Sequence, residues 1–233
     1  MRGLEPAERA RVHAEARERA VGAGAFLCRR GEPVEHWFGM ITGLAKMTVE
    51  TPTGRPVSFT GLPAGAWFGE GSLLKSEPRR YDVVALRASR VALVPRATFH
   101  ALLDSSIAFN RYVLHQLNER LAQFIGLVES ARQREPEARV ARALALLYNA
   151  QLYPGIERRL ALSQEEIGKL AGLSRQRANR ALRALEAAGL LRRAYGNVTV
   201  LDPEELRRYV GGRRPGSPSA EPAGARAGAE RNP

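Results

Sequence analysis

The alternation of apolar and polar positions in Leu162–Leu191 predicts two short helices joined by a tight turn. Ser163 and Glu166 have the spacing of a capping box, so the first helix is expected to begin there, and Gly172 is suited to end it. Ser174 is an N-cap residue for the second helix, whose apolar positions recur at spacings of four and three: Ala178, Leu182 and Leu185. Together the two helices form the pattern of a helix-turn-helix.

The opposite side of the second helix is polar and basic. It carries Gln176, Arg180 and Arg183, with Asn179 close by and Arg175 at the exposed N-terminal end. Guanidinium groups suit the two acceptors of guanine, and amides suit the acceptor and donor of adenine. Seven basic residues and one acidic residue lie between positions 169 and 193, and their net charge of +6 suits the neutralisation of phosphates. These features predict a DNA recognition helix; the alternative is a solvated helical hairpin.

A β-hairpin is predicted directly after this helix. Gly189 ends the helix, and the turn-forming pair Gly196–Asn197 lies between two short β-prone runs. Asp202–Pro203 then opens a last short helix that runs through Tyr209. A helix-turn-helix followed by a hairpin is a winged helix-turn-helix, in which the wing lies along the DNA backbone.

The first half of the chain has a different pattern. A polar helix is predicted over Pro6–Ala20, and short β-prone pieces follow it, with Gly or Pro in or near most of the breaks. The predicted strands are Ala25–Cys28, Trp37–Ile41, Ala45–Glu50, Pro56–Gly61, Ala66–Gly69, Asp82–Leu86 and Arg90–Val94. Short, closely spaced strands favour an antiparallel sandwich or barrel. A short helix is predicted over Pro95–Leu103.

A long helix is predicted from about Ser106 to Arg134. Its apolar positions alternate between spacings of three and four, which is typical of a seam between two parallel helices. The predicted dimer seam is Ile107, Asn110, Leu114, Leu117, Leu121, Phe124 and Val128, and Ala131 continues the series. Asn110 is interpreted as the polar seam residue that fixes the register. The alternative is that this face packs against the chain's own barrel.

A hinge is predicted after the long helix, at Glu135–Pro136, because a residue that precedes proline disfavours the helical conformation. A new helix is expected over Glu137–Gln151, with Val140, Leu144 and Leu147 in its core. The segment Tyr153–Gly155 then reads as a loop that leads to the first helix of the helix-turn-helix.

Composition narrows the choice of partners. The 233 residues carry a formal net charge of +12, which favours a polyanion, either nucleic acid or an anionic membrane surface. The N-terminus has no long apolar run, so neither a signal peptide nor a membrane span is expected, and we predict a cytoplasmic protein. The sequence contains no common catalytic motif, so we do not expect an enzyme.

Over roughly residues 20–210 the chain resembles the bacterial transcription regulators of the cyclic-AMP receptor protein/Fnr family. The motifs that carry the resemblance are Arg30–Gly31–Glu32, Ile41–Thr42–Gly43, Phe68–Gly69–Glu70 with Arg80, Glu137–Ala138–Arg139–Val140–Ala141, and Ser163 to Gly168 followed by Leu173–Ser174–Arg175. The expected fold is α+β: a cyclic-nucleotide-binding-type antiparallel β-barrel of the jelly-roll kind, a long dimerisation helix and a winged helix-turn-helix.

The resemblance also implies a division of the chain and a set of partners. The expected domains are residues 1–104 (barrel with its N-terminal helix), 105–135 (dimerisation helix and hinge), 136–210 (winged helix-turn-helix) and 211–233 (disordered tail). Such a protein binds double-stranded DNA as a homodimer on a palindromic site, under the control of an effector or state sensed in the barrel, with RNA polymerase as a further candidate partner. The alternative is a cyclic-nucleotide-binding regulatory module without specific DNA binding.

The candidate effector pocket is Gly69, Glu70, Arg80 and Tyr81. In nucleotide-binding members of the family, the glutamate takes the ribose hydroxyl and the arginine pairs with the cyclic phosphate. Tyr81–Asp82 departs from the small pair that normally follows this arginine, because it places a bulky ring and a negative charge near the expected anion. We therefore favour an internal Glu70–Arg80 ion pair that braces the barrel over a cyclic nucleotide as the ligand.

On the DNA side, the resemblance assigns base reading to Arg175, Gln176 and Arg180. Gln176 replaces the acidic residue of the family, so the preferred half-site should differ at that base pair. Contacts with the DNA backbone are predicted for Ser163, Ser174, Arg177, Asn179, Arg183, Arg192 and Arg193.

Other effectors of the family require particular ligand residues, and the sequence shows how many of these the chain contains. An iron–sulfur cluster usually needs four cysteines, and Cys28 is the one cysteine of the chain, so no such cluster is expected within it. The four histidines show no spacing that marks a haem ligand pair. Cys28 is interpreted as a buried structural residue, with a redox-sensing thiol beside Arg29 and Arg30 as the alternative. No metal site is predicted.

Overall fold

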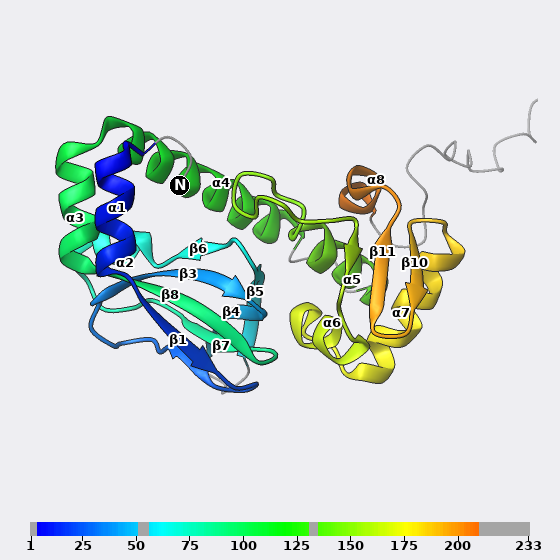
Figure 1. The fold of residues 1–233 in the computed structure, drawn as a ribbon. Helices are drawn as coiled ribbons and strands as arrows, with labels where there is room; N and C mark the ends of the chain where they lie inside the picture. The colour runs from blue at the N-terminus through cyan, green and yellow to red at the C-terminus, as the bar shows by residue number, and fades with distance from the viewer. Residues whose placement is uncertain (1–3, 51–55, 131–134, 210–233) are drawn as a thin grey trace, which may run out of the picture.

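Two four-stranded antiparallel sheets face each other in the N-terminal half of the protein, in a computed structural model that describes residues 4–50, 56–130 and 135–209 (Figure 1). One sheet has the strand order β1-β8-β3-β6 and the other β2-β7-β4-β5. The strands are β1 (Arg17–Val21), β2 (Phe26–Cys28), β3 (His36–Thr42), β4 (Leu44–Glu50), β5 (Pro56–Pro63), β6 (Trp67–Phe68), β7 (Asp82–Ala85) and β8 (Ser89–Pro95). The predicted antiparallel barrel is thus confirmed.

The interior of this barrel is apolar and closely packed. Its core includes Phe38, Met47, Leu62, Phe68 and Val83, all buried. The rings of Phe38 and Phe68 are stacked, with centroids 5.1 Å apart. A second core lies at the end of the barrel, where α1 (Pro6–Glu15), α3 (Arg96–Ser105) and the start of α4 (Ile107–Ser130) meet. The short helix α2 (Glu70–Lys75), which the sequence pattern did not predict, follows β6.

The N-terminal helix is shorter than predicted. It ends at Glu15, and Arg17–Val21 forms β1, which pairs antiparallel with β8 instead of continuing the helix to Ala20. The register places Arg17 opposite Leu93 and Val21 opposite Ser89. Pairing with a neighbouring strand therefore overrides the local helical preference of this polar segment.

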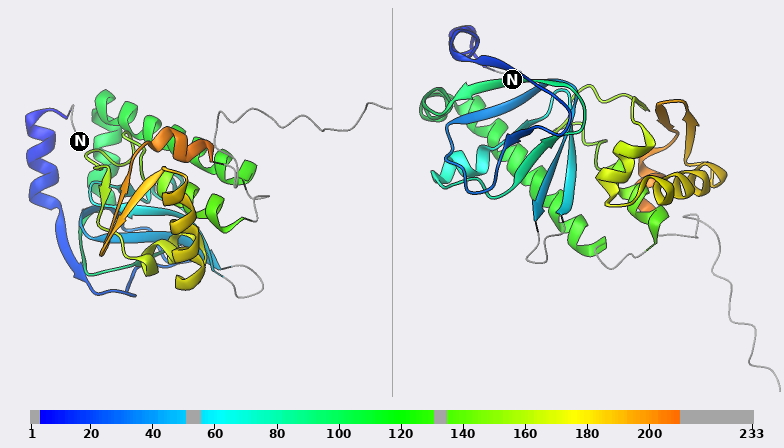
Figure 2. Two further views of the ribbon diagram at one scale, coloured as in Figure 1. Left: turned by 90° about the vertical axis from the view of Figure 1, so that its right-hand side faces the viewer. Right: turned by 90° about the horizontal axis from the view of Figure 1, so that it is seen from below.

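Helix α4 has two faces with different surroundings, and it connects the two halves of the molecule (Figures 1 and 2). One face is buried against the barrel and the C-terminal domain: Phe109, Val113, Gln116, Arg120 and Gln123. The other exposes apolar side chains at every seventh position: Ile107, Leu114, Leu121 and Val128, of which Leu114 is 65% and Val128 75% exposed. The helix therefore packs on its own barrel and still leaves an apolar row uncovered.

Three of the predicted seam residues lie elsewhere than in that exposed row. The Asn110 amide donates to the carbonyl oxygens of Leu103 and Ser106, so it ties α4 to α3. Leu117 is partly buried and packs on the core at the end of the barrel. Phe124 makes an edge contact with Phe59 of β5, with ring centroids 5.6 Å apart.

The C-terminal domain consists of helices around one core and a small three-stranded sheet of order β10-β11-β9. Its elements are α5 (Pro136–Ala145), β9 (Arg159–Leu160), α6 (Gln164–Ala171), α7 (Arg175–Ala187), β10 (Leu191–Ala194), β11 (Asn197–Val200) and α8 (Pro203–Arg208). The helix predicted to reach Gln151 ends at Ala145. The segment that follows it folds into a loop in which the Asn149 side chain accepts the N–H groups of Gln151 and Leu152.

The two domains touch directly as well as through α4. Leu44 and Leu86 of the barrel belong to the same apolar cluster as the core of the C-terminal domain. Arg87 pairs with Glu166 of α6, with 2.7 Å between Nε and Oε1. The Ser58 hydroxyl of β5 donates to the Lys169 carbonyl at 2.9 Å. These contacts fix α6, the first helix of the helix-turn-helix, against the barrel.

Candidate nucleic-acid interface and barrel interior

Helices α6 and α7 form the predicted helix-turn-helix. The Ser163 hydroxyl accepts the Glu166 N–H, and the Glu166 carboxylate accepts the Ser163 N–H, which completes the capping box. Gly172 ends α6 with a φ of 64°, in the left-handed region where glycine is favoured. The inner side of α7 is fully buried and consists of Ala178, Ala181, Leu182 and Leu185. The recognition helix is therefore anchored along its whole length.

The outer side of α7 faces away from the protein. The three predicted base-reading residues Arg175, Gln176 and Arg180 are exposed, as are Arg177 and Arg183. Among these five described side chains no ion pair is formed. Their charged and amide groups can therefore reach base edges and phosphates, the chemistry that a major-groove helix needs.

Some of the predicted DNA-backbone residues are exposed or cap a helix, and others are bonded to side chains of the same domain. Arg192 lies exposed on the wing, and Ser174 caps α7 through the Arg177 N–H. Arg193 instead binds Glu186, with 2.6 Å between Nε and Oε2, and also donates to the Asn179 side chain. Arg193 and Asn179 thus brace the wing against α7, and their contact with the DNA backbone stays a prediction.

The same brace affects the charge of Glu186. The backbone N–H of Arg193, followed by its guanidinium, lowers the pKa of the Glu186 carboxyl. Tyr195 stands fully exposed in the turn between β10 and β11, at the tip of the wing. The wing is therefore held in place from its inner side and presents its tip outward.

Arg139 is a basic residue of this surface that sequence reasoning did not assign. It lies on α5 and donates to the carbonyl of Gly172, the residue between α6 and α7. Burial, together with the nearby positive charge of Arg177, lowers its pKa. The sequence carried no signal for this, because the two residues meet only through the turn.

In the barrel, Glu70 makes an ion pair that differs from the predicted one. Its partner is Arg120 of α4, with 2.8 Å between Nε and Oε1, and the two side chains are 5% and 7% exposed. Arg120 also donates to the Trp67 carbonyl. Burial is the largest single influence on the pKa of Arg120 and lowers it, but the charge and hydrogen bond of Glu70, together with Tyr153 and Tyr81, outweigh burial and raise the pKa. An ion pair therefore does brace the barrel, but its arginine comes from the long helix α4.

Arg80, the predicted partner of Glu70, points to the solvent. Its side chain is 70% exposed and pairs with Glu77. The buried arginine is its neighbour Arg79, which donates to the carbonyls of Gly69 and His36. Side chains alternate between the two faces of an extended segment, so a shift of one residue exchanges inside for outside.

Two tyrosines belong to the apolar core of the barrel or pack against it. Tyr81 is partly buried against the barrel core, and burial raises its pKa. Tyr153, from the loop after α5, is completely buried in the same core. Arg80, which matches the phosphate-binding arginine of the family, thus faces outward, while Tyr153 is buried inside the barrel. Asp82 lies outside and accepts the Arg30 N–H.

Cys28 and the remaining candidate ligands give no sign of a redox or metal site in the part of the chain that is described. Burial raises the pKa of the Cys28 thiol to about 11, which disfavours the reactive thiolate. No cluster of three or more His, Cys, Asp or Glu side chains occurs among residues 4–50, 56–130 and 135–209. Within the same ranges, no helix has both the length and the apolar character to cross a membrane.

The chain has an antiparallel β-barrel, a long connecting helix and a winged helix-turn-helix with an exposed basic recognition helix. This is the architecture of a DNA-binding regulator. Comparison with known families agrees with this. Residues 18–106 match the cyclic nucleotide-binding domain, and residues 138–209 match the Crp-like helix-turn-helix domain. The chain belongs to the Crp/Fnr family of bacterial transcription regulators.

Similar proteins come from several bacteria. The chain is 25% identical over 209 residues to a CRP-like cAMP-activated global transcriptional regulator of Mycobacterium tuberculosis, covering 88% of this chain and 93% of that protein. It is 29% identical over 188 residues to the cAMP-activated global transcriptional regulator Vfr of Pseudomonas aeruginosa, covering 76% and 86%. Its fold is similar to that of FixK2 from Bradyrhizobium japonicum, with a TM-score of 0.66, 20% identity, and coverage of 83% and 96%.

Proposed function

We propose that this protein is a transcription regulator that binds a palindromic DNA site as a homodimer. The observation that carries the proposal is the recognition helix α7, whose inner side is buried while Arg175, Gln176 and Arg180 are exposed. Arg175 and Arg180 are suited to guanine, and Gln176 to adenine. Arg177, Arg183 and Arg192 supply phosphate contacts, and Arg139 adds one at the turn. The protein acts where the chromosome lies, in the cytoplasm, and regulates access or recruitment of RNA polymerase there.

The dimer in this proposal forms along the exposed row of α4. An apolar side chain at every seventh position suits a parallel pairing of two long helices. The four residues of this row are Ile107, Leu114, Leu121 and Val128. A two-fold axis along α4 places the two α7 helices in successive major grooves, about 34 Å apart, so the site is expected to be palindromic.

The experiment is selection from a random duplex pool with the purified full chain. We expect one palindrome, with two arms of equal strength. Arg180→Ala should cost roughly 1–3 kcal/mol of binding free energy and relax the preference at one base pair of each arm. Arg177→Ala is the matched control, because it should weaken all sequences alike. A pool without enrichment, or an Arg180→Ala variant that keeps the wild-type preference, contradicts the proposal.

A further inference from the structure

The loop between α5 and β9 enters the barrel from the C-terminal domain. Leu152 and Tyr153 are 1% and 0% exposed, and both belong to the apolar core that the two barrel sheets enclose. The Tyr153 hydroxyl lies 3.3 Å from the Thr60 hydroxyl of β5. The chain next to it is also tight, since a Cβ at Gly65 would stand 3.1 Å from the Pro154 carbonyl oxygen. A segment of the DNA-binding domain thus forms part of the barrel core.

Tyr153 lies near the charged pair of the barrel, because it shares the barrel core with Ala66 and Phe68, which flank the Trp67 carbonyl that accepts from Arg120. Glu70 has one carboxylate oxygen, Oε2, that is buried and has no hydrogen-bond partner among the described residues. The tyrosine therefore occupies the space next to the polar groups to which a small ligand of the barrel would have to bind.

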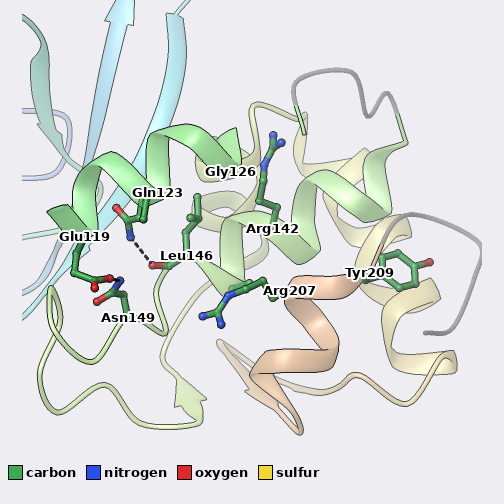
Figure 3. Close-up of a pocket in the computed structure, with 10 residues that line it drawn as sticks. Glu119, Gln123, Gly126, Arg142, Leu146, Asn149, Arg207 and Tyr209 are labelled. Carbon is green, nitrogen blue, oxygen red and sulfur yellow. Dashed lines mark hydrogen bonds between the residues drawn. The ribbon is translucent and has the colours of Figure 1, made fainter. Parts of the chain in front are cut away.

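Three polar side chains of α4 hold the same loop on its other side. Gln116 donates to the Gln151 carbonyl at 2.9 Å, and Gln123 donates to the Leu146 carbonyl at 3.2 Å. Glu119 accepts the Asn149 amide at 2.7 Å. Figure 3 shows the last two contacts at the edge of a cavity of about 510 Å³ between α4, α5 and α8. The loop is fastened along its length, so its burial is not an isolated contact.

We propose that Tyr153 is a built-in occupant of the barrel, which takes the place of a diffusible effector and holds the helix-turn-helix in a DNA-binding arrangement. This rests on the function proposed above. With Tyr153 inserted, α6 is fixed to the barrel through Ser58 and Arg87, while the reading face of α7 remains exposed. A domain that is already held in its DNA-binding arrangement loses less conformational freedom when it binds DNA, so its affinity for DNA is higher. Tyr153 is accordingly a positioning residue for DNA recognition.

The test measures the affinity of the full chain for its selected duplex by fluorescence anisotropy, with and without cyclic AMP or cyclic GMP. Wild type and Tyr153→Phe should bind equally well, and neither nucleotide should change their affinity. Tyr153→Ala should bind about tenfold more weakly or worse, and phenol, which has the size and shape of the missing ring, should restore its affinity. A rise of tenfold or more in wild-type affinity with either nucleotide overturns the proposal, and so does Tyr153→Ala binding as tightly as wild type.

Hydrogen exchange separates positioning from simple loss of stability. In Tyr153→Ala, the amides of α6 and β5 at the domain contact should exchange faster, while those of Val140 and Leu182 in the core of the DNA-binding domain keep their wild-type protection. Equal acceleration at all these positions would mean general destabilisation and would overturn the positioning role.

A further measurement distinguishes this proposal from the DNA-binding function. Calorimetry should detect phenol binding to Tyr153→Ala and not to Tyr153→Phe, and wild-type amides at Leu152 and Tyr153 should exchange slowly. Neither result requires DNA. If no duplex is selected but both results are found, the function fails while the occupied barrel stands. Rapid exchange at Tyr153 in the wild type, or no phenol binding to Tyr153→Ala, overturns the occupied barrel itself.

Discussion

Replacing Glu70 with Gln tests whether the ion pair inside the barrel is as dry as the structure indicates. With 2.8 Å between the atoms, the attraction is about 6 kcal/mol at an effective dielectric constant of about 20, and desolvation of the two ions offsets much of it. Glu70→Gln leaves the Arg120 charge buried without its anion, and this is expected to cost about 3–5 kcal/mol of unfolding free energy. Replacing both residues, as in Glu70→Leu with Arg120→Met, should recover most of that loss.

Urea unfolding at one fixed protein concentration, followed by tryptophan fluorescence, is the assay. Arg120 donates to the Trp67 carbonyl and the rings of Trp37 and Trp67 are 4.1 Å apart, so the signal reports on this part of the barrel. Glu77→Gln is the control, because it breaks a pair with the exposed Arg80 and should leave the urea midpoint unchanged. If Glu70→Gln shifts the midpoint no more than the control does, water reaches the pair and the reasoning is refuted.

Three further predictions follow from exposure and charge. Burial raises the pKa of the Cys28 thiol to about 11, so iodoacetamide should label it at pH 8 only in the unfolded protein. Because the pKa is raised in the folded state, the contribution of the protonated thiol to stability is present below about pH 9 and is lost as the pH rises towards 11. Leu121→Glu should give a monomer in light scattering, whereas Ile41→Glu on the barrel surface should stay dimeric; equal masses for the two variants would count against the α4 seam. Arg192→Ala should lower the slope of log affinity against log salt by about 0.9, as measured by salt titration of DNA binding. Arg193→Ala should leave that slope unchanged and instead lower the unfolding free energy by about 1 kcal/mol, as measured by thermal melts. Equal salt slopes for the two variants would contradict this distinction.

The DNA-binding half was predictable because its signals are local. A capping box, a glycine at the end of a helix and an apolar face each lie within a few residues, and Ser163, Glu166 and Gly172 act in the structure as the pattern indicates. The exposed side of α7 followed from helical periodicity alone. The exception was Arg193, whose partner Glu186 lies seven residues away, across a change from helix to strand.

The barrel interior was less predictable because its partners are distant in sequence. The residue that neutralises Glu70 is fifty positions away, on a different element, and no spacing rule connects the two. Arg79 and Arg80 are adjacent arginines, and the sequence pattern cannot tell which of them faces inward unless the strand register is known. Tyr153 looked like an ordinary loop residue, because its burial depends on how the second domain packs against the first.

Helix α4 joins these distant features on one rigid element. Gln116, Arg120 and Gln123 lie on one face at spacings of four and three, and they hold in turn the loop that carries Tyr153, the carboxylate of Glu70 and the end of α5. The opposite face carries the exposed apolar row. A helix turns as a unit, so a rotation that improved the packing of two α4 helices would move all three polar contacts together. Three features therefore cannot change independently: the alignment of the dimer seam, the barrel ion pair and the position of the DNA-binding domain. A substitution on either face of α4 is expected to alter the contacts of the opposite face.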